Sequence, residues 1–389
     1  MKNILVAIGS RANFGSIKSV LASVHAHPNL NLKIMTFASA VLPKYGNLEE
    51  QMRISGFPPD YSLETQIEGD SVSSMAESTG LALLKIPGVI RSLKPDYVIT
   101  VGDRYETMAT AISASYMNVP LIHTMGGEVT GSIDESIRHA ITKLSHIHFV
   151  ATEQSRINLI QMGEKLESIF VTGCPRIDLA KEARNISIED LQVKASAFGV
   201  GDEIDFRKPF LMISQHPVTS EFSYSAQQMT DTLNSVSGFD LPLLILWPNA
   251  DAGSDNISKV IRRWTEINKR TKAHFYRNLP PEIYLKLMDL TSCLIGNSSS
   301  AIREGAYLGT PSVNVGTRQS GREHGENVTF VQNEENQIKS AIKKQLSHGK
   351  FHENLLYGSG NAGKKIAEIV SSLHSIDTQK ILSFPKRSM

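Results

Sequence analysis

The sequence predicts an α/β protein made of two doubly wound domains. Its 389 residues exceed what a single hydrophobic core usually supports. Short apolar, β-branched runs alternate with helical patterns along the chain. These runs are apolar throughout rather than at every second position, which is typical of parallel sheets covered by helices on both faces. A composition of 41% hydrophobic and 20% charged residues fits a soluble globular protein.

Eleven apolar runs are expected to form strands. In the first half they are residues 3–9, 32–38, 96–102, 119–123, 147–151 and 169–172. In the second half they are residues 209–214, 242–248, 273–277, 293–296 and 311–315. Helices are expected between them, for example over Ser16–Ala26 and Glu106–Met117.

A polar stretch at residues 181–208 interrupts this alternation, so we expect a domain boundary there. The predicted domains are an N-terminal Rossmann-like domain over residues 1–180 and a C-terminal one over residues 205–360. Ligands of doubly wound sheets bind beyond the carboxyl ends of the strands. The Gly, Asp, His and Ser clusters of this chain all follow predicted strands.

Composition and charge exclude several classes of protein. A formal net charge of +1 indicates no broad attraction to nucleic acid or to an anionic membrane. The N-terminal apolar run is too short for a signal peptide, and no run approaches the roughly 18 residues of a transmembrane helix. Cys174 and Cys293 have no C-x-x-C partner, which favours buried free thiols in a reducing cytoplasm and no metal site.

The first candidate site is "VAIGSRANFGSIK", residues 6–18, which reads as a strand, a glycine turn and a helix. Glycines allow a ligand to approach the main chain, and the helix start offers free N–H groups to a phosphate. The segment is neither G-x-G-x-x-G nor a Walker A loop. Arg11 favours an anion, although an ordinary strand–helix turn explains the same pattern.

Two acidic segments follow the next strands. In "VGDRYE", residues 101–106, Asp103 either caps the following helix or directs a carboxylate into an interdomain cleft. In "HTMGGEVTGSIDESIRHAITK", residues 123–143, Glu128 and Asp134 flank a loop with three glycines. Several carboxylates in one cleft raise the pKa of one of them, which provides an acid and a base near neutral pH. Alternatively, Asp134 caps a helix that carries Arg138 on its surface.

The second half offers a histidine and an asparagine on loops that follow strands. In "ISQHPVTSE", His216 stands directly after a strand and before a proline. It is either a structural histidine or one that faces the carboxylates of the first domain. In "WPNADAGSDN", Asn249 lies at the polar tip of a similar loop.

The segment "IGNSSSAIREGAYLGTPSVNVGTRQSGR", residues 295–322, combines a strand, a Ser-rich turn and a helix. The hydroxyls and N-terminal amides of Ser298, Ser299 and Ser300 predict a diphosphate site. Glu304, in the following helix, has a carboxylate that can accept two ribose hydroxyls, and Arg318 can close over an anion. A helix capped by serine accounts for the same turn without a ligand.

Taken together, these segments resemble the hydrolysing UDP-N-acetylglucosamine 2-epimerases. The resemblance rests on "GSRANFG", "GDRYE", "GGEVTGSIDESIRHAITKLSHIHF", "QMGE", "HPVTSE", "PNADAGS", "GNSSSAIRE" and "GTRQ", which occur in order over roughly residues 4–325. It implies the GT-B fold with an interdomain active-site cleft, in which the second domain holds UDP and the sugar faces the first domain. It also implies that a final helix within residues 361–389 crosses back to the N-terminal domain.

The reaction implied by the resemblance removes UDP together with the proton on sugar C2. The resulting 2-acetamidoglucal then adds water, which turns UDP-N-acetylglucosamine into N-acetylmannosamine for sialic acid synthesis. A sister group acts in the same way on UDP-N,N′-diacetylbacillosamine, on the legionaminic acid route. The implied enzyme is cytoplasmic, needs no cofactor or metal, and is a homodimer or homotetramer.

Residue roles follow from the same resemblance. Asp103 and Asp134 match acid/base positions, and Glu128 matches the Glu of "GGE". Arg11, Arg138, His216 and the serine turn are expected to stabilise the leaving diphosphate and the bound sugar.

One position departs from the family pattern. Many members have Glu directly before the two glycines, where this chain has Met125. If that Glu acts as an acid or a base in those members, its task in this chain must be carried out by Glu128, Asp134, a histidine or water. A methionine also makes the pocket more apolar, which favours a different sugar.

Two other functions remain open from the sequence. One is a GT-B glycosyltransferase, which would need an acceptor. The other is a nucleotide-sugar-binding protein that has lost catalysis, for which Met125 is the only support. Release of UDP from UDP-N-acetylglucosamine without an acceptor distinguishes the hydrolysing epimerase from both.

Overall fold

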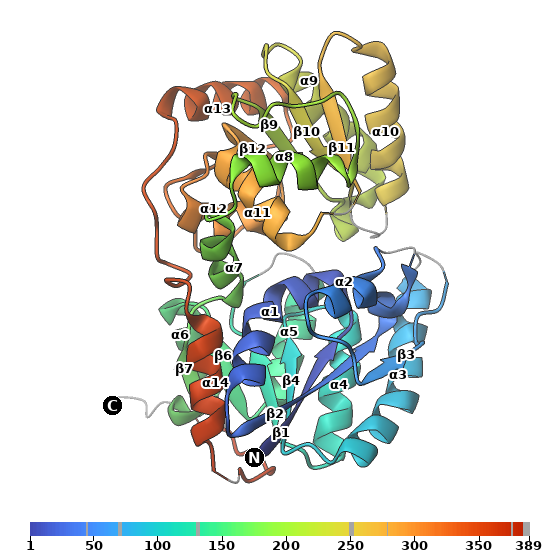
Figure 1. Ribbon diagram of the computed structural model, residues 1–389, viewed down its shortest axis with the longest axis vertical. Coiled ribbons are helices and arrows are strands. Elements are labelled where there is room, and N and C mark those ends of the chain that lie inside the picture. The colour runs from blue at the N-terminus through green and yellow to red at the C-terminus, as the bar shows by residue number, and fades with distance from the viewer. Residues whose placement is uncertain are drawn as a thin grey trace. The chain divides into compact units, whose positions relative to one another are not determined.

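The computed structural model describes residues 1–43, 46–68, 72–129, 133–248, 253–277, 279–374 and 376–383. It divides into two compact units. Unit 1 comprises Met1–Val129, Ile133–Asp178 and Gly358–Met389, and unit 2 is built around Leu179–Tyr357. Each unit is a seven-stranded, mainly parallel sheet covered by helices (Figure 1), which confirms the predicted α/β class.

The sheet of unit 1 is parallel throughout and has the strand order β3-β2-β1-β4-β5-β6-β7. Its strands are β1 (Lys2–Ile8), β2 (Leu30–Phe37), β3 (Tyr61–Leu63), β4 (Tyr97–Val101), β5 (Leu121–Thr124), β6 (Ile147–Val150) and β7 (Ile169–Val171). The six strands predicted for this half are all present. The sequence analysis missed β3, an edge strand of three residues with no fully buried side chain.

Helices cover both faces of this sheet. They are α1 (Arg11–Ala26), α2 (Leu48–Ile54), α3 (Val72–Leu93), α4 (Tyr105–Tyr116), α5 (Ile133–Leu144), α6 (Glu153–Gln161) and α14 (Ala362–Ser372), with the 3-10 turns η1 (Ala38–Val41) and η3 (Leu166–Ser168). One core cluster joins α3, α4 and α5 to the sheet through residues such as Ile86, Ala109 and Ile141. Helix α1 begins five residues before the predicted start, because Ser10 caps it by accepting a hydrogen bond from Asn13 N–H.

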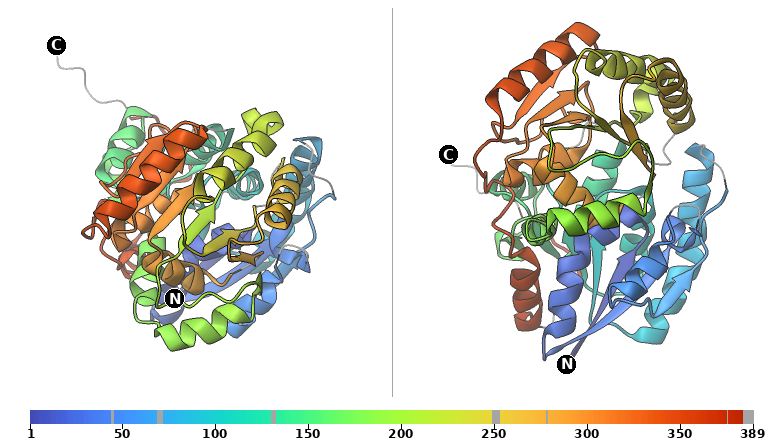
Figure 2. Two further views of the ribbon diagram at one scale, coloured as in Figure 1. Left: turned by 90° about the horizontal axis from the view of Figure 1, so that it is seen from above. Right: turned by 45° about the horizontal axis from the view of Figure 1, so that its top comes forward.

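The end of the chain belongs to unit 1, where α14 packs beside α1 (Figures 1 and 2). Asp178 accepts hydrogen bonds from the N–H groups of Ala362 and Gly363, at 2.9 and 2.7 Å, so a carboxylate caps the start of α14. A Cβ at Gly363 would lie 2.5 Å from the carbonyl oxygen of Ser19, so the absence of a side chain there allows the close approach of the two helices.

The segment after α14 runs along the strand starts of unit 1. The hydroxyl of Tyr97 donates to the carbonyl of His374 at 2.7 Å, and Ser383 N–H donates to the carbonyl of Gly163 at 2.9 Å. Lys380, within this segment, joins an ionic cluster in which its Nζ lies 2.5 Å from the buried Glu164 carboxylate. The C-terminal segment is therefore an integral part of unit 1.

The sheet of unit 2 has the strand order β14-β13-β12-β9-β10-β11-β8 and is parallel except at β8. Its strands are β8 (Gly199–Gly201), β9 (Leu211–Ser214), β10 (Leu243–Leu246), β11 (Ala273–Tyr276), β12 (Cys293–Gly296), β13 (Ser312–Val315) and β14 (Val328–Val331). The five predicted strands are present, and β8 and β14 are additional. Strand β8 lies within the stretch that the sequence analysis left between the domains, and it pairs antiparallel with β11.

Unit 2 carries its own helices and its own core. The chain enters it within α7 (Pro175–Ala183); the following helices are α8 (Ile188–Ser196), α9 (Ser225–Val236), α10 (Ser254–Ile267), α11 (Pro281–Leu290), α12 (Glu304–Leu308) and α13 (Glu335–His348), with the 3-10 turns η4 (Thr219–Tyr224) and η5 (Ser299–Ala301). The core includes Leu211, Ile245 and Ile295. Among the described residues of both units, no helix is both long and apolar enough to cross a membrane.

Candidate active site

The turns after β1 and β4 of unit 1 contact each other, because these strands are parallel neighbours. Asn13 connects the two, since its Oδ1 accepts from Gly9 N–H at 3.1 Å and its Nδ2 donates to the Val101 carbonyl at 3.4 Å. A Cβ at Gly9 would lie 2.4 Å from Cγ of the buried Glu106. The glycine of "IGSR" therefore provides space for a neighbouring side chain as well as for a turn.

A buried arginine joins three segments at this edge of the sheet. Arg138, on α5, is only 1% exposed. Its Nη2 binds the Asp103 carboxylate on the loop after β4, and its Nη1 donates to the Met125 carbonyl after β5 at 2.5 Å. The alternative that placed Arg138 on the surface of its helix is therefore wrong. The arginine holds a carboxylate and a main-chain carbonyl in one place.

Asp134 occupies the first turn of α5, one helical turn before Arg138. Residues four apart lie on the same helix face, so Asp134 is on the face that carries Arg138. Its carboxylate also lies near the positive end of the α5 dipole, where a negative charge is favourable. The following residue, Glu135, instead pairs with His139 at 3.4 Å on a more exposed part of the helix.

The two glycines of the "MGGE" loop pack against neighbouring elements. Gly127 has φ +76°, and a Cβ there would lie 2.4 Å from the carbonyl oxygen of Ser155 on α6. The Gly127 carbonyl accepts from Asn158 Nδ2 at 2.8 Å. Glu128 follows as a buried carboxylate. This part of the loop therefore packs closely against α6. The third glycine of the loop lies outside the described residues.

Met125 stands where β5 ends and has a conformation unusual for a side chain of its type. Its φ is +65°, in the left-handed region, and its side chain is only 5% exposed. Its N–H donates to the Phe149 carbonyl at 2.9 Å, while its carbonyl accepts from Arg138. The main chain of Met125 is thus fixed on both sides, and its carbonyl contacts the arginine that binds Asp103, while its apolar side chain is buried.

His123, on β5, is a buried residue that the sequence analysis did not single out. Its Nε2 lies 2.8 Å from the Gly102 carbonyl and its Nδ1 lies 3.3 Å from the Thr142 hydroxyl. Burial lowers the pKa of His123 to about 3, against a smaller opposing effect of the Gly102 carbonyl. The imidazole is therefore neutral and connects the loop of Asp103 to α5, so it is not an acid at neutral pH.

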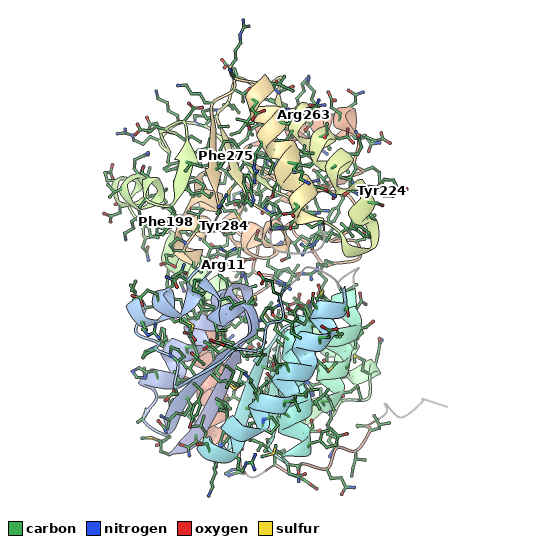
Figure 3. The ribbon with its side chains drawn as sticks, turned by 90° about the vertical axis from the view of Figure 1, so that its right-hand side faces the viewer. Arg11, Phe198, Tyr224, Arg263, Phe275 and Tyr284 are labelled. Atoms are coloured by element: carbon green, nitrogen blue, oxygen red, sulfur yellow. The ribbon has the colours of Figure 1, made fainter. Side chains whose placement is uncertain are left out.

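Arg11 is the first residue of α1, at the strand-end edge of unit 1 (Figure 3). Burial lowers its pKa from the usual value. A guanidinium remains protonated in proteins, so Arg11 brings a partly desolvated positive charge to this edge. Such a charge binds anions more strongly than one fully surrounded by water.

In unit 2, Asn297 connects the loops that carry the candidate residues. It follows β12, and its side-chain amide both accepts from the N–H of His216 and donates to its carbonyl, each at 2.8 Å. Its own carbonyl accepts from Arg318 Nη1 at 3.1 Å and from Gln319 Nε2 at 2.9 Å. Because both bond to Asn297, His216 and Arg318 lie close to each other. The sequence analysis missed Asn297, although an amide directly after a strand in "GNSSS" was an available signal.

The serine turn starts a 3-10 turn rather than a long helix. Ser298 caps η5 by accepting from Ser300 N–H at 3.4 Å, and the two hydroxyls lie 2.8 Å apart. The Ser300 hydroxyl also bonds to the hydroxyl of Tyr284. Ser298 and Ser299 are half-buried, whereas Ser300 is buried. A diphosphate bound at this turn, as the sequence predicts, would meet hydroxyls that already form hydrogen bonds with one another.

Glu304 is the first residue of α12, and its side chain is completely buried at 0% exposure. A ribose can reach its carboxylate only if the residues that cover it move. Asn249 lies outside the described residues. Within the described parts of the chain, no group of three or more His, Cys, Asp or Glu side chains has the arrangement of a metal site.

Relatives with known names extend over nearly the whole chain. The chain is 32% identical over 381 residues to the hydrolysing UDP-N,N′-diacetylbacillosamine 2-epimerase of Legionella pneumophila, covering 96% of this chain and 97% of that protein. It is 30% identical over 375 residues to the UDP-N-acetylglucosamine 2-epimerase of Neisseria meningitidis, covering 96% of each chain.

Solved structures with the same fold carry related names. The UDP-GlcNAc 2-epimerase of Neisseria meningitidis bound to UDP-GlcNAc superposes with a TM-score of 0.79 at 19% identity, over 95% of this chain and 99% of that one. The enzyme of Methanocaldococcus jannaschii in complex with UDP-GlcNAc and UDP has a TM-score of 0.78 at 16% identity, with the same coverage. The chain thus has the predicted GT-B-like fold. The family model described as UDP-N-acetylglucosamine 2-epimerase matches residues 22–371, so the chain belongs to the UDP-N-acetylglucosamine 2-epimerase family.

Proposed function

We propose that this protein is a hydrolysing 2-epimerase that converts a UDP-2-acetamido sugar and water into UDP and the free sugar inverted at C2. The observation that carries the proposal is the buried contact of Arg138 with Asp103, because it holds a carboxylate at the strand-end edge where ligands of such sheets bind. Membership in an epimerase family supports the same reaction.

The proposed reaction has two steps. In the first, a base takes the C2 proton, the C1–O bond to UDP breaks, and a 2-acetamidoglucal forms. In the second, water adds its hydroxyl to C1, and C2 receives a proton on the opposite face. Asp103, Asp134 and Glu128 are the candidate acid and base groups, since carboxylates of this kind typically contribute 10²–10⁴-fold to proton transfer. Arg138 acts as a positioning residue, because it orients Asp103.

The diphosphate of UDP develops negative charge as the C1–O bond breaks. We propose that residues of unit 2 and Arg11 stabilise this charge, because donors fixed before the reaction need no rearrangement. The residues are Arg11, His216, Ser298, Ser299, Ser300 and Arg318. Support comes from Asn297, which holds the His216 and Arg318 loops together, and from the partial burial of Arg11. Glu304 is proposed to bind the ribose after the residues around it rearrange.

Two sugars are candidates for the substrate. UDP-N,N′-diacetylbacillosamine is favoured by the name of the Legionella relative and by Met125, whose buried apolar side chain fits an acetamido methyl group better than a hydroxyl. This reverses the order of preference from the sequence analysis, in which UDP-N-acetylglucosamine came first. UDP-N-acetylglucosamine remains the second candidate, because the Neisseria relative is named for that sugar.

The deciding experiment incubates the protein with each UDP-sugar in deuterated water, with no cofactor or acceptor added. We expect UDP release, a free sugar inverted at C2, and deuterium at C2. A sugar that keeps all of its original C2 hydrogen would exclude the elimination route. A glycosyltransferase would need an acceptor for transfer, and a non-catalytic binding protein would release no UDP. The double variant Asp103→Asn and Asp134→Asn is the control for contaminating activity.

A further inference from the structure

Two aromatic side chains are exposed on η4, the 3-10 turn in the segment between β9 and α9. Phe222 is 54% exposed and Tyr224 is 66% exposed. Among the described residues, neither ring contacts another aromatic ring, and the Tyr224 hydroxyl forms no hydrogen bond. An aromatic ring contributes much binding energy when it is covered, so two uncovered rings on one turn suggest a ligand contact. We call Phe222 and Tyr224 the aromatic rim.

The turn that carries the aromatic rim is fixed to two other loops of unit 2. The Glu221 carboxylate accepts from the Thr317 hydroxyl, in the loop after β13, at 2.6 Å. The Ser225 Oγ lies 2.7 Å from the carbonyl oxygen of Phe222 and 3.4 Å from that of Gly253, in the loop after β10. A Cβ at Gly253 would lie 3.4 Å from the Cβ of Phe222. The aromatic rim is therefore a surface that is in place before a ligand binds.

The aromatic rim adjoins the residues proposed for the diphosphate. His216 lies six positions before Phe222 in the same segment, and Thr317 directly precedes Arg318. Asn297 bonds to both His216 and Arg318. Ligands of doubly wound sheets bind where such loops follow the strands. In a UDP-sugar the sugar is bonded directly to the diphosphate, so the surface next to the diphosphate residues is within reach of the sugar.

We propose that the aromatic rim contacts the sugar of the UDP-sugar and selects a sugar with apolar substituents. This inference rests on the proposed function, because it concerns the sugar accepted at the same site. N,N′-diacetylbacillosamine carries an acetamido group at C4 and no oxygen at C6, whereas N-acetylglucosamine carries a hydroxyl group on each of these carbons. Methyl groups gain free energy when they are covered by aromatic rings, and a hydroxyl loses its water there without a replacement partner. The aromatic rim therefore favours UDP-N,N′-diacetylbacillosamine.

The aromatic rim is a second source of sugar selection beside Met125. Met125 belongs to unit 1, whereas η4 belongs to unit 2. The two groups share no hydrogen bond in the described residues, so we expect their effects on sugar preference to multiply.

The first test compares the natural protein with Phe222→Ala and Tyr224→Ala on both UDP-sugars. Each substitution should lower kcat/KM for UDP-N,N′-diacetylbacillosamine by roughly tenfold and change that for UDP-N-acetylglucosamine by less than about threefold. Phe198→Ala is the matched control, because Phe198 is a 44% exposed phenylalanine of unit 2. Figure 3 shows Phe198 and Tyr224 at opposite edges of that unit. Equal losses on the two sugars, or no loss on either, would overturn the proposal.

The second test measures binding without turnover, in the double variant Asp103→Asn and Asp134→Asn. Adding Phe222→Ala to it should weaken binding of UDP-N,N′-diacetylbacillosamine by roughly tenfold in isothermal titration calorimetry. The affinity for UDP alone should stay within about twofold, because the aromatic rim contacts the sugar and not the nucleotide. Tyr224→Phe should leave both affinities unchanged, since the ring and not the hydroxyl makes the contact.

The two tests together distinguish this proposal from the proposed function. A natural protein that binds both UDP-sugars but releases no UDP would overturn the proposed function alone, and the calorimetric comparison would still decide the role of the aromatic rim. A protein that hydrolyses the UDP-sugar but binds it equally well with and without Phe222→Ala would overturn the aromatic rim alone. A loss of UDP affinity as large as the loss of UDP-sugar affinity would also exclude a contact with the sugar.

Discussion

Arg138 on α5 binds the carboxylate of Asp103, a residue 35 positions earlier in the chain, and the arginine is almost completely buried. The same guanidinium holds the carbonyl of Met125. Because Asp103 follows β4 and Met125 follows β5, one side chain determines how two neighbouring strand ends are arranged.

Arg138→Met should lower kcat/KM by roughly 10²-fold or more, because Asp103 loses the group that orients it. The double variant with Asp103→Asn should be little worse than Asp103→Asn alone, since the two residues act as a unit. Steady-state kinetics of the four proteins give this comparison. His139→Gln, on the next residue of the same helix, should stay within about twofold of the natural rate. Independent, multiplicative effects of the two substitutions would contradict the positioning role.

Asp103→Asn and Asp134→Asn should each lower kcat by roughly 10²-fold or more with a smaller change in KM, as expected for acid and base groups. The asparagine keeps the size of the side chain but cannot exchange a proton at neutral pH. Glu135→Gln is the matched control, because Glu135 shares the first turn of α5 but pairs with His139. Near-natural turnover of either aspartate variant would remove that residue from the chemistry.

Met125→Glu should shift the ratio of kcat/KM values away from UDP-N,N′-diacetylbacillosamine and toward UDP-N-acetylglucosamine by roughly tenfold, the scale of discrimination by one pocket group. A carboxylate at this buried position replaces an apolar contact with a polar one. Met125→Leu keeps an apolar side chain and should leave the preference unchanged. Equal effects of the two substitutions on both sugars would show that Met125 does not select the substrate.

Glu304→Gln should weaken UDP binding by about 1.5–3 kcal/mol, the scale of hydrogen bonds to a charged group. The effect should appear in KM more than in kcat, because substrate and product share the nucleotide. Isothermal titration calorimetry with UDP measures it, and Glu335→Gln on α13 serves as the exposed control. The isosteric change avoids a cavity at this buried position. A variant with natural UDP affinity would make Glu304 a structural residue of α12.

The C-terminal segment should contribute to stability through Glu164. This buried carboxylate accepts from His148 Nε2 at 3.0 Å, Lys143 Nζ at 2.6 Å and Lys380 Nζ at 2.5 Å. Burial alone would raise the pKa of Glu164, but the hydrogen bonds from His148, Lys143 and Lys380 prevail and lower it to about 2. A lowered folded-state pKa stabilises the protein above the ordinary glutamate pKa, and this contribution is lost as the pH falls from about 4.5 toward 2.

Glu164→Gln should therefore lower the free energy of unfolding at pH 7 by about 2–4 kcal/mol, and its difference from the natural protein should vanish near pH 2. Urea unfolding at several pH values provides the measurement. Glu167→Gln, an exposed residue three positions later, should have no such effect. A destabilisation by Glu164→Gln that does not change with pH would exclude the ionic origin.

Strands that are apolar throughout could be predicted from the sequence, because burial on both faces of the sheet requires an unbroken run of apolar residues. All five residues of β4 are buried, and the predicted run at 96–102 contains them. Strands β3 and β8 have only three residues each, and β8 contains two glycines. Three residues are too few to show a hydrophobic pattern that predicts a strand. Such an edge strand is stabilised by pairing with its neighbour in the sheet, which the local sequence does not reveal.

The sequence by itself determined which chemical groups follow which strands: Asp103 after β4, the "MGGE" loop after β5, and His216 after β9. Local order along the chain is sufficient for that. Only the tertiary structure decided that Arg138 is buried against Asp103, that Asn297 joins the His216 and Arg318 loops, and that Glu304 has no exposed surface. The physical reason is that hydrogen bonding and burial depend on which strands are neighbours in the sheet. The local sequence around each residue does not show which distant strand will lie beside it.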